Sequence, residues 1–172
     1  MRYWLGLGAN LGDRRAAMAR AVRALEADGH RVEAVSAVYE TAPRDLEDQP
    51  AFLNAAVRVQ TGLAPPDLLD AVKRIERDLG RDPGGPRYGP RTLDCDLLLW
   101  EGGAWREERL EIPHPRLAER RFALLPVHDL DPGLRLPDGR ALADLAARID
   151  PAEQPARRLA EPLVRGAAGA GA

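Results

Sequence analysis

The sequence predicts an α+β fold of the ferredoxin-like type, in which two helices cover one face of an antiparallel sheet. Its elements follow in the order strand, helix, strand, strand, helix, strand. The second and third strands are joined by a loop, whereas a doubly wound parallel sheet would need a helix there. The length of 172 residues suits a single domain.

Local patterns predict each element of the first half. Residues 2–8 (RYWLGLG) form an apolar run that a turn at 8–10 closes, which is typical of a strand. A helix follows up to Gly29, because Met18, Val22 and Leu25 recur at helical spacing, with Asn10 and Asp13 as candidate caps. Residues 32–38 and 52–60 have strand character, and 41–50, with two prolines, predicts a loop.

The second half continues the pattern. Pro65 and Pro66 open an amphipathic helix that Gly80 stops. Residues 82–90 hold three prolines and three glycines and predict an irregular loop, and residues 93–100 predict a strand. We expect another strand within 105–112 and helices within 115–129 and 134–149. Because 13 of the 22 residues from 151 onward are Ala, Gly or Pro, we expect a domain over 1–150 and a disordered tail over 151–172.

Composition excludes several classes of protein. With 25 basic and 27 acidic residues the net charge is −2, so no overall field favours nucleic acid or anionic lipid. No apolar run approaches the roughly 20 residues that a membrane span requires, and the N-terminus lacks the pattern of a secretory leader. Cys95 is the one cysteine, which fits a reducing compartment. We expect a cytoplasmic monomer with no nucleic-acid or membrane partner.

Two aspartates carry the strongest chemical prediction. Side chains alternate along a strand, so Asp94 and Asp96 point to one face with Cα atoms about 6.5 Å apart, while Cys95 faces the other side as a small buried apolar residue. Two carboxylates this close repel each other unless a cation lies between them. Mg2+ prefers oxygen ligands and keeps waters and substrate phosphates in its shell. A solvated pair at a strand end is the alternative.

Basic residues gather just before this pair. Residues 73–91 contain six basic and three acidic side chains, a local charge of +3. Phosphoryl transfer needs such cations, because charge develops on the peripheral oxygens of the transferred group. A solvated basic loop is the alternative. The chain has no Gly-x4-Gly-Lys-Ser/Thr motif and no complete dinucleotide fingerprint, so a nucleotide would have to be held by the metal site and the arginines.

Four motifs in order give a family resemblance. RYGPRTLDCDLL (87–98), GANLG (8–12), DQPAFLN (48–54) and IPHP (112–115) together resemble the 6-hydroxymethyl-7,8-dihydropterin pyrophosphokinase family of folate biosynthesis. The resemblance runs from about residue 2 to 149 and implies a ferredoxin-like fold. It also implies an ATP-dependent diphosphokinase, in which the pterin hydroxymethyl oxygen attacks the β-phosphorus of ATP and AMP leaves.

The resemblance implies roles for particular residues. Asp94 and Asp96 would bind two Mg2+ ions, and Arg81 and Arg91 would share the catalytic role with them. The ATP-binding residues it implies are Lys73, Glu76, Arg81, Arg87, Arg91, Leu97, Arg109, His114 and Arg120. The pterin-binding residues it implies are Thr41, Phe52, Asn54, Tyr88, Asp94 and Phe122. Phe52 and Phe122 would stack on the pterin ring and Asn54 would read its amide-like edge.

Some positions depart from the family pattern, and two other functions stay open. Tyr88, Pro83 and Ala42 replace residues usual in the family, which bears on loop closure and substrate affinity. One alternative is another Mg-dependent transferase with an Asp-x-Asp pair, such as a nucleotidyltransferase. The other is a ferredoxin-like RNA-binding module, which would need aromatic side chains on the central strands, where this chain has Leu, Val and Ala. No residue is predicted as a general base.

Overall fold

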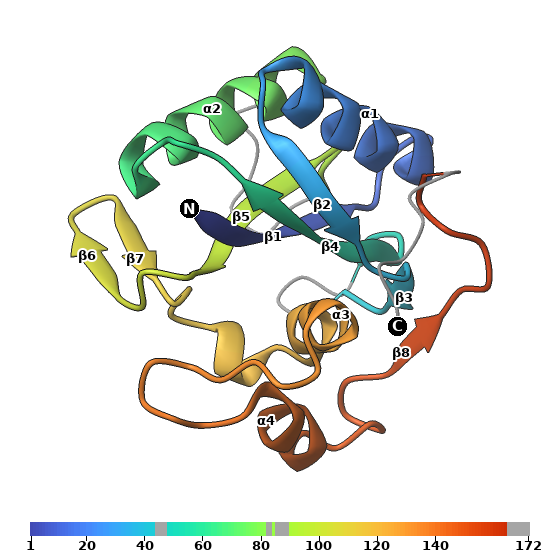
Figure 1. Ribbon diagram of the computed structural model, residues 1–172. Helices are drawn as coiled ribbons and strands as arrows, with labels where there is room; N and C mark the ends of the chain where they lie inside the picture. Colours follow the sequence, from blue (N-terminus) through green and yellow to red (C-terminus); the bar gives the residue numbers. More distant parts are fainter. Residues whose placement is uncertain (44–47, 82–83, 85–89, 165–172) are drawn as a thin grey trace.

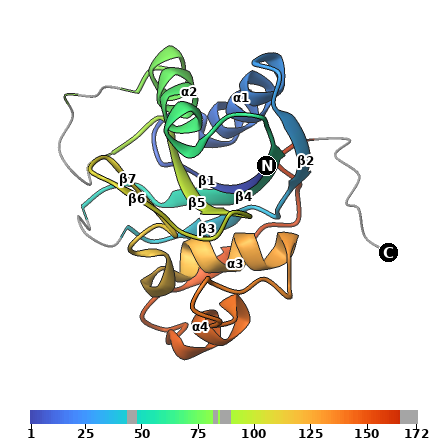
Figure 2. The ribbon, with the colours of Figure 1, turned by 60° about the vertical axis from the view of Figure 1, so that its left-hand side comes forward.

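The computed structural model describes residues 1–43, 48–81, 84 and 90–164. An antiparallel sheet lies between two pairs of helices, with α1 and α2 on one face and α3 and α4 on the other (Figures 1 and 2). The strands of this sheet are β1 (Arg2–Ala9), β2 (Arg31–Val35), β3 (Tyr39–Thr41), β4 (Phe52–Gln60), β5 (Asp94–Trp100) and β8 (Ala156–Arg158).

The strand order confirms the predicted fold class. The order is β5-β1-β4-β3-β8, β2 also pairs with β4, and every pairing is antiparallel. Because β2 and β3 lie one after the other along β4, they occupy the place of one strand. The sequence predicted a single strand over 32–38, whereas residues 36–38 are irregular and β3 extends to Thr41. The resulting order is that of a ferredoxin-like sheet.

The helices α1 (Arg14–Ala27) and α2 (Pro65–Asp78) cover the first face. The Asp13 side chain caps α1 by accepting a hydrogen bond from the amide of Ala16, and Gly29 ends the turn after the helix with a φ of 86°. The prediction that Asn10 caps this helix is wrong, because its side chain bonds elsewhere. Both helices bury their apolar stripes in the core beneath the sheet, through Met18, Val22, Leu25, Leu68, Val72 and Ile75.

A second core fills the opposite face. The 3-10 turn η1 (Leu117–Glu119) leads into α3 (Arg121–Leu130), and α4 (Leu142–Arg148) packs on α3 (Figure 2). This core holds Trp4 and Leu98 from the sheet with Leu124, Val127 and Leu142 from the helices. Since β1 and β5 are covered on both faces, both strands are largely apolar, apart from Arg2 and the glycines of β1 and the two aspartates of β5.

Residues 105–112, predicted as one strand, form the hairpin β6 (Trp105–Glu107) and β7 (Leu110–Ile112). The expectation of disorder from residue 151 is wrong for residues 151–164. Strand β8 pairs with the edge strand β3, and Leu163 is buried in the first core. Open backbone groups at a sheet edge accept any extended partner, so Ala, Gly and Pro content alone does not exclude a strand. Residues 165–172 lie outside the described residues.

No helix among the described residues is long and apolar enough to cross a membrane.

Candidate active site

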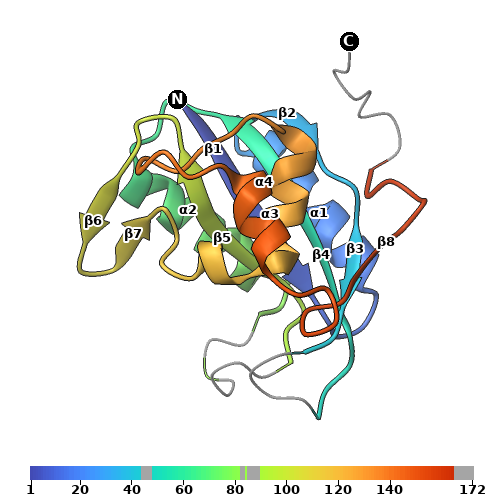
Figure 3. The same cartoon turned by 90° about the horizontal axis from the view of Figure 1, so that it is seen from below.

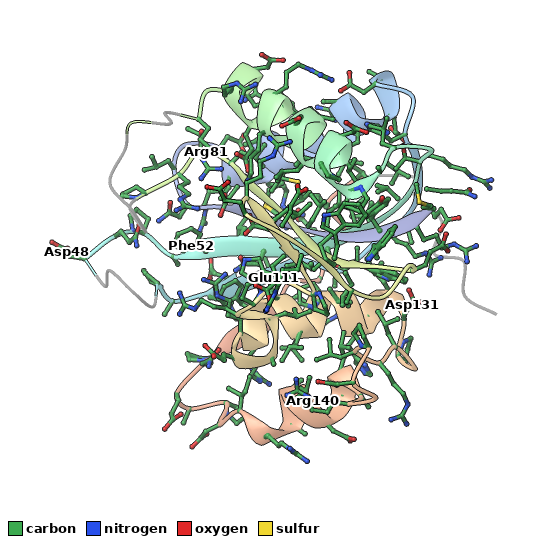
Figure 4. The ribbon with its side chains drawn as sticks, turned by 90° about the vertical axis from the view of Figure 1, so that its left-hand side faces the viewer. Asp48, Phe52, Arg81, Glu111, Asp131 and Arg140 are labelled. Atoms are coloured by element: carbon green, nitrogen blue, oxygen red, sulfur yellow. The ribbon has the colours of Figure 1, made fainter. Side chains whose placement is uncertain are left out.

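A cavity of about 440 Å³ opens at one end of the sheet, on the face that α3 covers. It lies where β1 ends, where β4 and β5 begin and where the chain enters α3. Figure 4 shows Phe52 and Arg81 toward this same end of the molecule. Nine of the residues that the sequence predicted line the cavity: Thr41, Phe52, Asn54, Arg91, Asp94, Asp96, His114, Arg120 and Phe122.

The Asn10 side chain brings three of the four motifs together. It is buried, accepts a hydrogen bond from the amide of Arg91 at 2.8 Å and donates one to Gln49 Oε1 and one to the carbonyl of Pro50, both at 3.0 Å. The backbone amide of Asn10 also donates to the carbonyl of Arg91. One buried amide therefore fixes the loops before β4 and β5 against the end of β1.

Two glycines of β1 form the floor of the cavity. Gly6 pairs with Asp96 and Gly8 pairs with Asp94 in the sheet. A Cβ atom at Gly8 would lie 3.3 Å from Oδ1 of Asn54, and one at Gly6 would lie 3.0 Å from a methyl carbon of Leu98. Gly6 was not among the site residues predicted from the sequence, although a glycine inside an apolar strand often marks a close approach of another group.

Asp94 lies between two guanidinium groups. Arg91 Nη1 is 2.5 Å from its Oδ2, and Arg81 Nη1 is 3.0 Å from its Oδ1. Its Oδ1 is buried and has no hydrogen bond of good geometry among the described residues. Burial and the nearby charge of Asp96 raise the pKa of Asp94 to about 6, against the opposing effect of Arg91, Lys73 and Arg81. A further cation at this carboxylate would therefore be favourable.

Lys73 and Glu76 hold α2 against β5 behind the two aspartates. Glu76 is buried and accepts hydrogen bonds from Lys73 Nζ (2.7 Å), from the amide of Cys95 (2.6 Å) and from Arg81. Lys73 Nζ also lies 3.5 Å from Asp96. Burial alone would lower the pKa of Lys73, but Asp96 and Glu76 raise it, so the ammonium stays charged. Glu76 thus positions other groups and is absent from the cavity wall.

The other half of the cavity can hold a flat heterocycle. Phe52 begins β4 and Phe122 lies in the first turn of α3, and both line the cavity. Asn54 and Thr41 also line the cavity and are buried, and Asn54 Nδ2 donates to Thr41 Oγ1 at 2.7 Å. This bond leaves Oδ1 and one amide hydrogen of Asn54 for a ligand. Arg120 lies over the Phe122 ring at 5.6 Å from its centroid.

His114 lines the same cavity as the two aspartates. Its Nδ1 accepts a hydrogen bond from the amide of Arg116 at 3.1 Å, so the neutral ring carries its proton on Nε2. Burial lowers the pKa of His114, more than the nearby Asp96 raises it. The ring is thus a neutral donor at neutral pH.

Several predicted residues lie elsewhere. The Leu97 side chain packs in the first core, on the opposite face of β5 from the aspartates, and Leu98 lines the cavity instead. Arg109 is exposed and pairs with Asp70 on α2 at 2.7 and 3.0 Å. Arg87 and Tyr88, like Pro83, lie outside the described residues.

The structure adds lining residues that the sequence analysis did not assign to the site. These are Gly6, Leu7, Gly8, Ala42, Pro43, Gln49, Ala55, Leu98, Pro115, Arg116 and Ala123. The alternation of β5 could have identified Leu98, since Asp94, Asp96 and Leu98 share one face. Among the described residues no three acidic, His or Cys side chains cluster as a metal site, so the two aspartates are the candidate ligands.

The chain is similar to known proteins of one family. A family model described as 7,8-dihydro-6-hydroxymethylpterin-pyrophosphokinase (HPPK) matches residues 4–132. Proteins named 2-amino-4-hydroxy-6-hydroxymethyldihydropteridine pyrophosphokinase are similar to the chain. The one from Methylorubrum extorquens is 44% identical over 151 residues, 87% of this chain and 94% of that protein. The one from Pseudomonas aeruginosa is 44% identical over 147 residues, 85% of this chain and 90% of that protein.

Other relatives are longer. The mitochondrial folate synthesis bifunctional protein of Pisum sativum is 44% identical over 126 residues, 73% of this chain, but the chain spans only 24% of its length. A solved structure of wild-type Plasmodium falciparum HPPK-DHPS shares the fold, with a TM-score of 0.67 at 14% identity, over 86% of this chain and 44% of that one. Since the family model matches three quarters of the sequence, the chain belongs to the 7,8-dihydro-6-hydroxymethylpterin-pyrophosphokinase (HPPK) family.

Proposed function

We propose that the protein transfers the terminal two phosphates of ATP, as one pyrophosphoryl group, to the hydroxymethyl oxygen of 6-hydroxymethyl-7,8-dihydropterin. The bond from that oxygen to the β-phosphorus forms, the bond from the β-phosphorus to the oxygen of the α-phosphate breaks, AMP leaves, and the hydroxyl proton is released to water. The observation that carries the proposal is one cavity with two different halves. An aromatic and amide-lined half adjoins a half with two carboxylates, arginines and a neutral histidine.

The aromatic half would bind the pterin. Phe52 and Phe122 would stack on the bicyclic ring, an arrangement worth about 0.5–1.5 kcal/mol per aromatic pair beyond the buried area. Asn54 would present its free Oδ1 and amide hydrogen to the pterin edge, while its bond to Thr41 fixes the orientation of the amide group. Correct orientation of the pterin hydroxymethyl oxygen, which accepts the pyrophosphoryl group, would supply a large part of the rate enhancement.

The charged half would bind the triphosphate. Arg91, Arg120 and His114 line it, and Arg81 lies against Asp94, so each can donate to phosphate oxygens. Lys73 stays charged beside Asp96 and would balance the negative charge of the nucleotide. Because charge develops on the transferred group, these donors would bind the transition state more tightly than the ground state.

The two aspartates fit Mg2+, the ion that we propose as cofactor, with two ions per site. They supply oxygen ligands from one face of β5, and the buried Oδ1 of Asp94 lacks a well-formed hydrogen bond among the described residues. Mg2+ when bound would neutralise phosphate oxygens and orient the triphosphate. Asp94, held by Arg91, and Asp96, beside Lys73, would be its protein ligands.

Product analysis tests this function. The protein is incubated with ATP labelled at the γ-phosphate, Mg2+ and the reduced pterin alcohol, and the nucleotides and pterins are separated. We expect AMP and a labelled pterin diphosphate in equal amounts, with neither product when the pterin is omitted or when EDTA is added. Free labelled pyrophosphate would instead identify a nucleotidyltransferase. RNA binding that weakens with salt, without ATP turnover, would identify an RNA-binding module.

We also propose that the protein works as a monomer in the cytoplasm. The cytoplasmic part of the proposal rests on the lone cysteine, which is buried and forms no disulfide. Light scattering at several protein concentrations tests the monomeric state. The expected result is a constant mass of 18.8 kDa.

A further inference from the structure

The segment that follows α4 touches the cavity walls from outside. Residues 151–155 turn back toward α3 and lead into β8, which pairs with β3 (Figure 3). A small cavity of about 40 Å³ separates Glu153, Gln154 and Pro155 from Phe122 and the Thr41–Pro43 strand end. This segment therefore lies directly behind two parts of the pterin half. It also lies beyond residues 4–132, which the family model matches.

Gln154 bonds to the two peptide groups on either side of Arg120. Its Oε1 accepts a hydrogen bond from the amide of Arg121 at 2.9 Å, and its Nε2 donates to the carbonyl of Glu119 at 2.9 Å. The Arg121 guanidinium in turn donates to the carbonyl of Gln154 at 3.2 Å. One carboxamide thus spans the junction between η1 and α3.

This junction needs a partner from outside. Arg120 is the N-cap of α3, and its side chain makes no capping hydrogen bond to the helix. Its φ and ψ of −117° and 97° are extended, so neither helix continues through it. The first amides of a helix have no acceptor within the helix. Gln154 supplies an acceptor for the first of these amides, that of Arg121.

The junction carries residues from both halves of the cavity. Arg120 and Phe122 both line it, and the Arg120 guanidinium lies over the Phe122 ring. A rotation of the peptide groups around Arg120 would therefore move a phosphate-binding group and a pterin-stacking ring together. At the other end of the segment, Ala156 pairs with Thr41, which bonds to Asn54.

We infer that Gln154 is a positioning residue for substrate binding: its carboxamide fixes the peptide groups around Arg120, and so aims Arg120 at the triphosphate and Phe122 at the pterin. The inference rests on the proposed function. Gln154 itself is not in the cavity wall described above and does not take part in the transfer.

The test compares three variants of the full chain. Gln154→Ala removes both hydrogen bonds, Gln154→Glu keeps the acceptor for the Arg121 amide, and Gln60→Ala is the matched control, an exposed glutamine at the far end of β4. The measurements are Tm, kcat, and KM for ATP and for the pterin. For Gln154→Ala we expect kcat/KM to fall about tenfold, mainly through the pterin KM, while Tm stays near that of Gln60→Ala.

Gln154→Glu separates positioning from general loss of structure. A carboxylate at this helix N-terminus still accepts the Arg121 amide hydrogen but cannot donate to the Glu119 carbonyl, so we expect its kcat/KM to lie between the values of the wild type and of Gln154→Ala. Kinetic constants of Gln154→Ala equal to those of Gln60→Ala would overturn the inference. So would a Gln154→Glu variant with wild-type Tm that is as impaired as Gln154→Ala.

The inference can fail separately from the proposed function. If the wild-type protein releases no AMP, the proposed function fails, and calorimetric binding of ATP and of the pterin replaces the kinetics. Weaker binding by Gln154→Ala than by Gln60→Ala would then support the positioning role. Equal binding, or no binding by any form, would overturn it.

Discussion

Asp94 and Asp96 are two residues apart yet have different surroundings. Asp94 is held by two arginines, whereas Asp96 forms an ion pair with Lys73 at 3.5 Å, and its side chain is partly exposed to the cavity. Substitution of Asp94 would therefore break its ion pairs with Arg81 and Arg91, whereas substitution of Asp96 would break only the longer ion pair with Lys73. A substitution at Asp96 should report on the chemistry with the fold intact.

We expect Asp96→Ala to reduce turnover by at least about 100-fold, because a ligand of the proposed Mg2+ site is removed. Its Tm should stay within a few degrees of the wild-type value. The matched control is Asp78→Ala, an exposed aspartate near the end of α2, which should keep full turnover. AMP release measures activity and thermal denaturation measures stability. Near-normal turnover of Asp96→Ala would contradict the assigned role of the carboxylate pair.

His30 makes a second prediction at this scale, about stability. It is buried, its Nδ1 lies 3.0 Å from Thr61 Oγ1, and its Nε2 has no hydrogen-bond partner among the described residues. Burial lowers the pKa of His30 below 6.5; Arg74 lowers it further and Asp28 opposes. Below pH 6.5 the unfolded chain therefore binds a proton that the folded chain resists, and acid favours unfolding.

His30→Asn keeps a polar atom near Thr61 but cannot titrate. We expect the free energy of unfolding of the wild type to fall more steeply between pH 7 and pH 5 than that of His30→Asn, and the two to run parallel above pH 7. Asp94, with its raised pKa, works in the opposite direction but equally in both proteins, so it cancels in the comparison. Urea titrations at several pH values measure this difference, and identical slopes below pH 6.5 would contradict it.

At the scale of elements, strand β1 shows how backbone shape sets the site. Gly6 and Gly8 face the two aspartates across the pairing with β5 and leave the cavity floor open. Alanine is better than glycine in a strand for conformational entropy. At Gly8 its methyl group would instead press on Asn54 Oδ1 at 3.3 Å. Replacing Gly8 by alanine should therefore change the stability of the fold and the binding of substrate independently of each other.

Gly8→Ala should leave Tm unchanged or slightly raised and weaken pterin binding by about 1 kcal/mol, equivalent to about fivefold in KM. Gly62→Ala is the matched control, since no heavy atom lies within 4 Å of its added Cβ. Steady-state kinetics with saturating ATP measure the effect. An unchanged pterin KM would show that Asn54 moves aside freely.

The helices and strands could be predicted from the sequence better than the long-range contacts that bury them. The alternation of β5 correctly put Asp94 and Asp96 on one face, because the period of a strand is local. Glu76 shows the limit. Its helical spacing from Lys73 places both on one face of α2, but only the packing of α2 on β5 shows that Glu76 is buried under the Cys95 amide. Gln154 lies 34 residues from Arg120, and nothing local predicts their contact.

At the scale of the whole molecule, the C-terminal segment decides where the domain ends. The composition predicted a domain of residues 1–150, yet Leu159 donates its amide hydrogen to the Val38 carbonyl, and the Leu163 side chain is only 5% exposed. Long-range pairing of this kind adds to the core without leaving any periodic pattern in the sequence. The described part of the segment thus joins the sheet edge and places one side chain, Leu163, in the core.

Leu163→Ala tests whether this packing contributes to the stability of the domain. Removing a buried leucine side chain should cost about 2–3 kcal/mol, which lowers Tm by about 6 °C in a chain of this size. Leu11→Ala is the matched control, because Leu11 is 37% exposed and should change Tm little. Thermal denaturation of both variants measures the difference. Equal Tm values for Leu163→Ala, Leu11→Ala and the wild type would contradict this prediction. Residues 151–164 would then add nothing to the stability of the core, and the domain would end near residue 150, as its composition predicts.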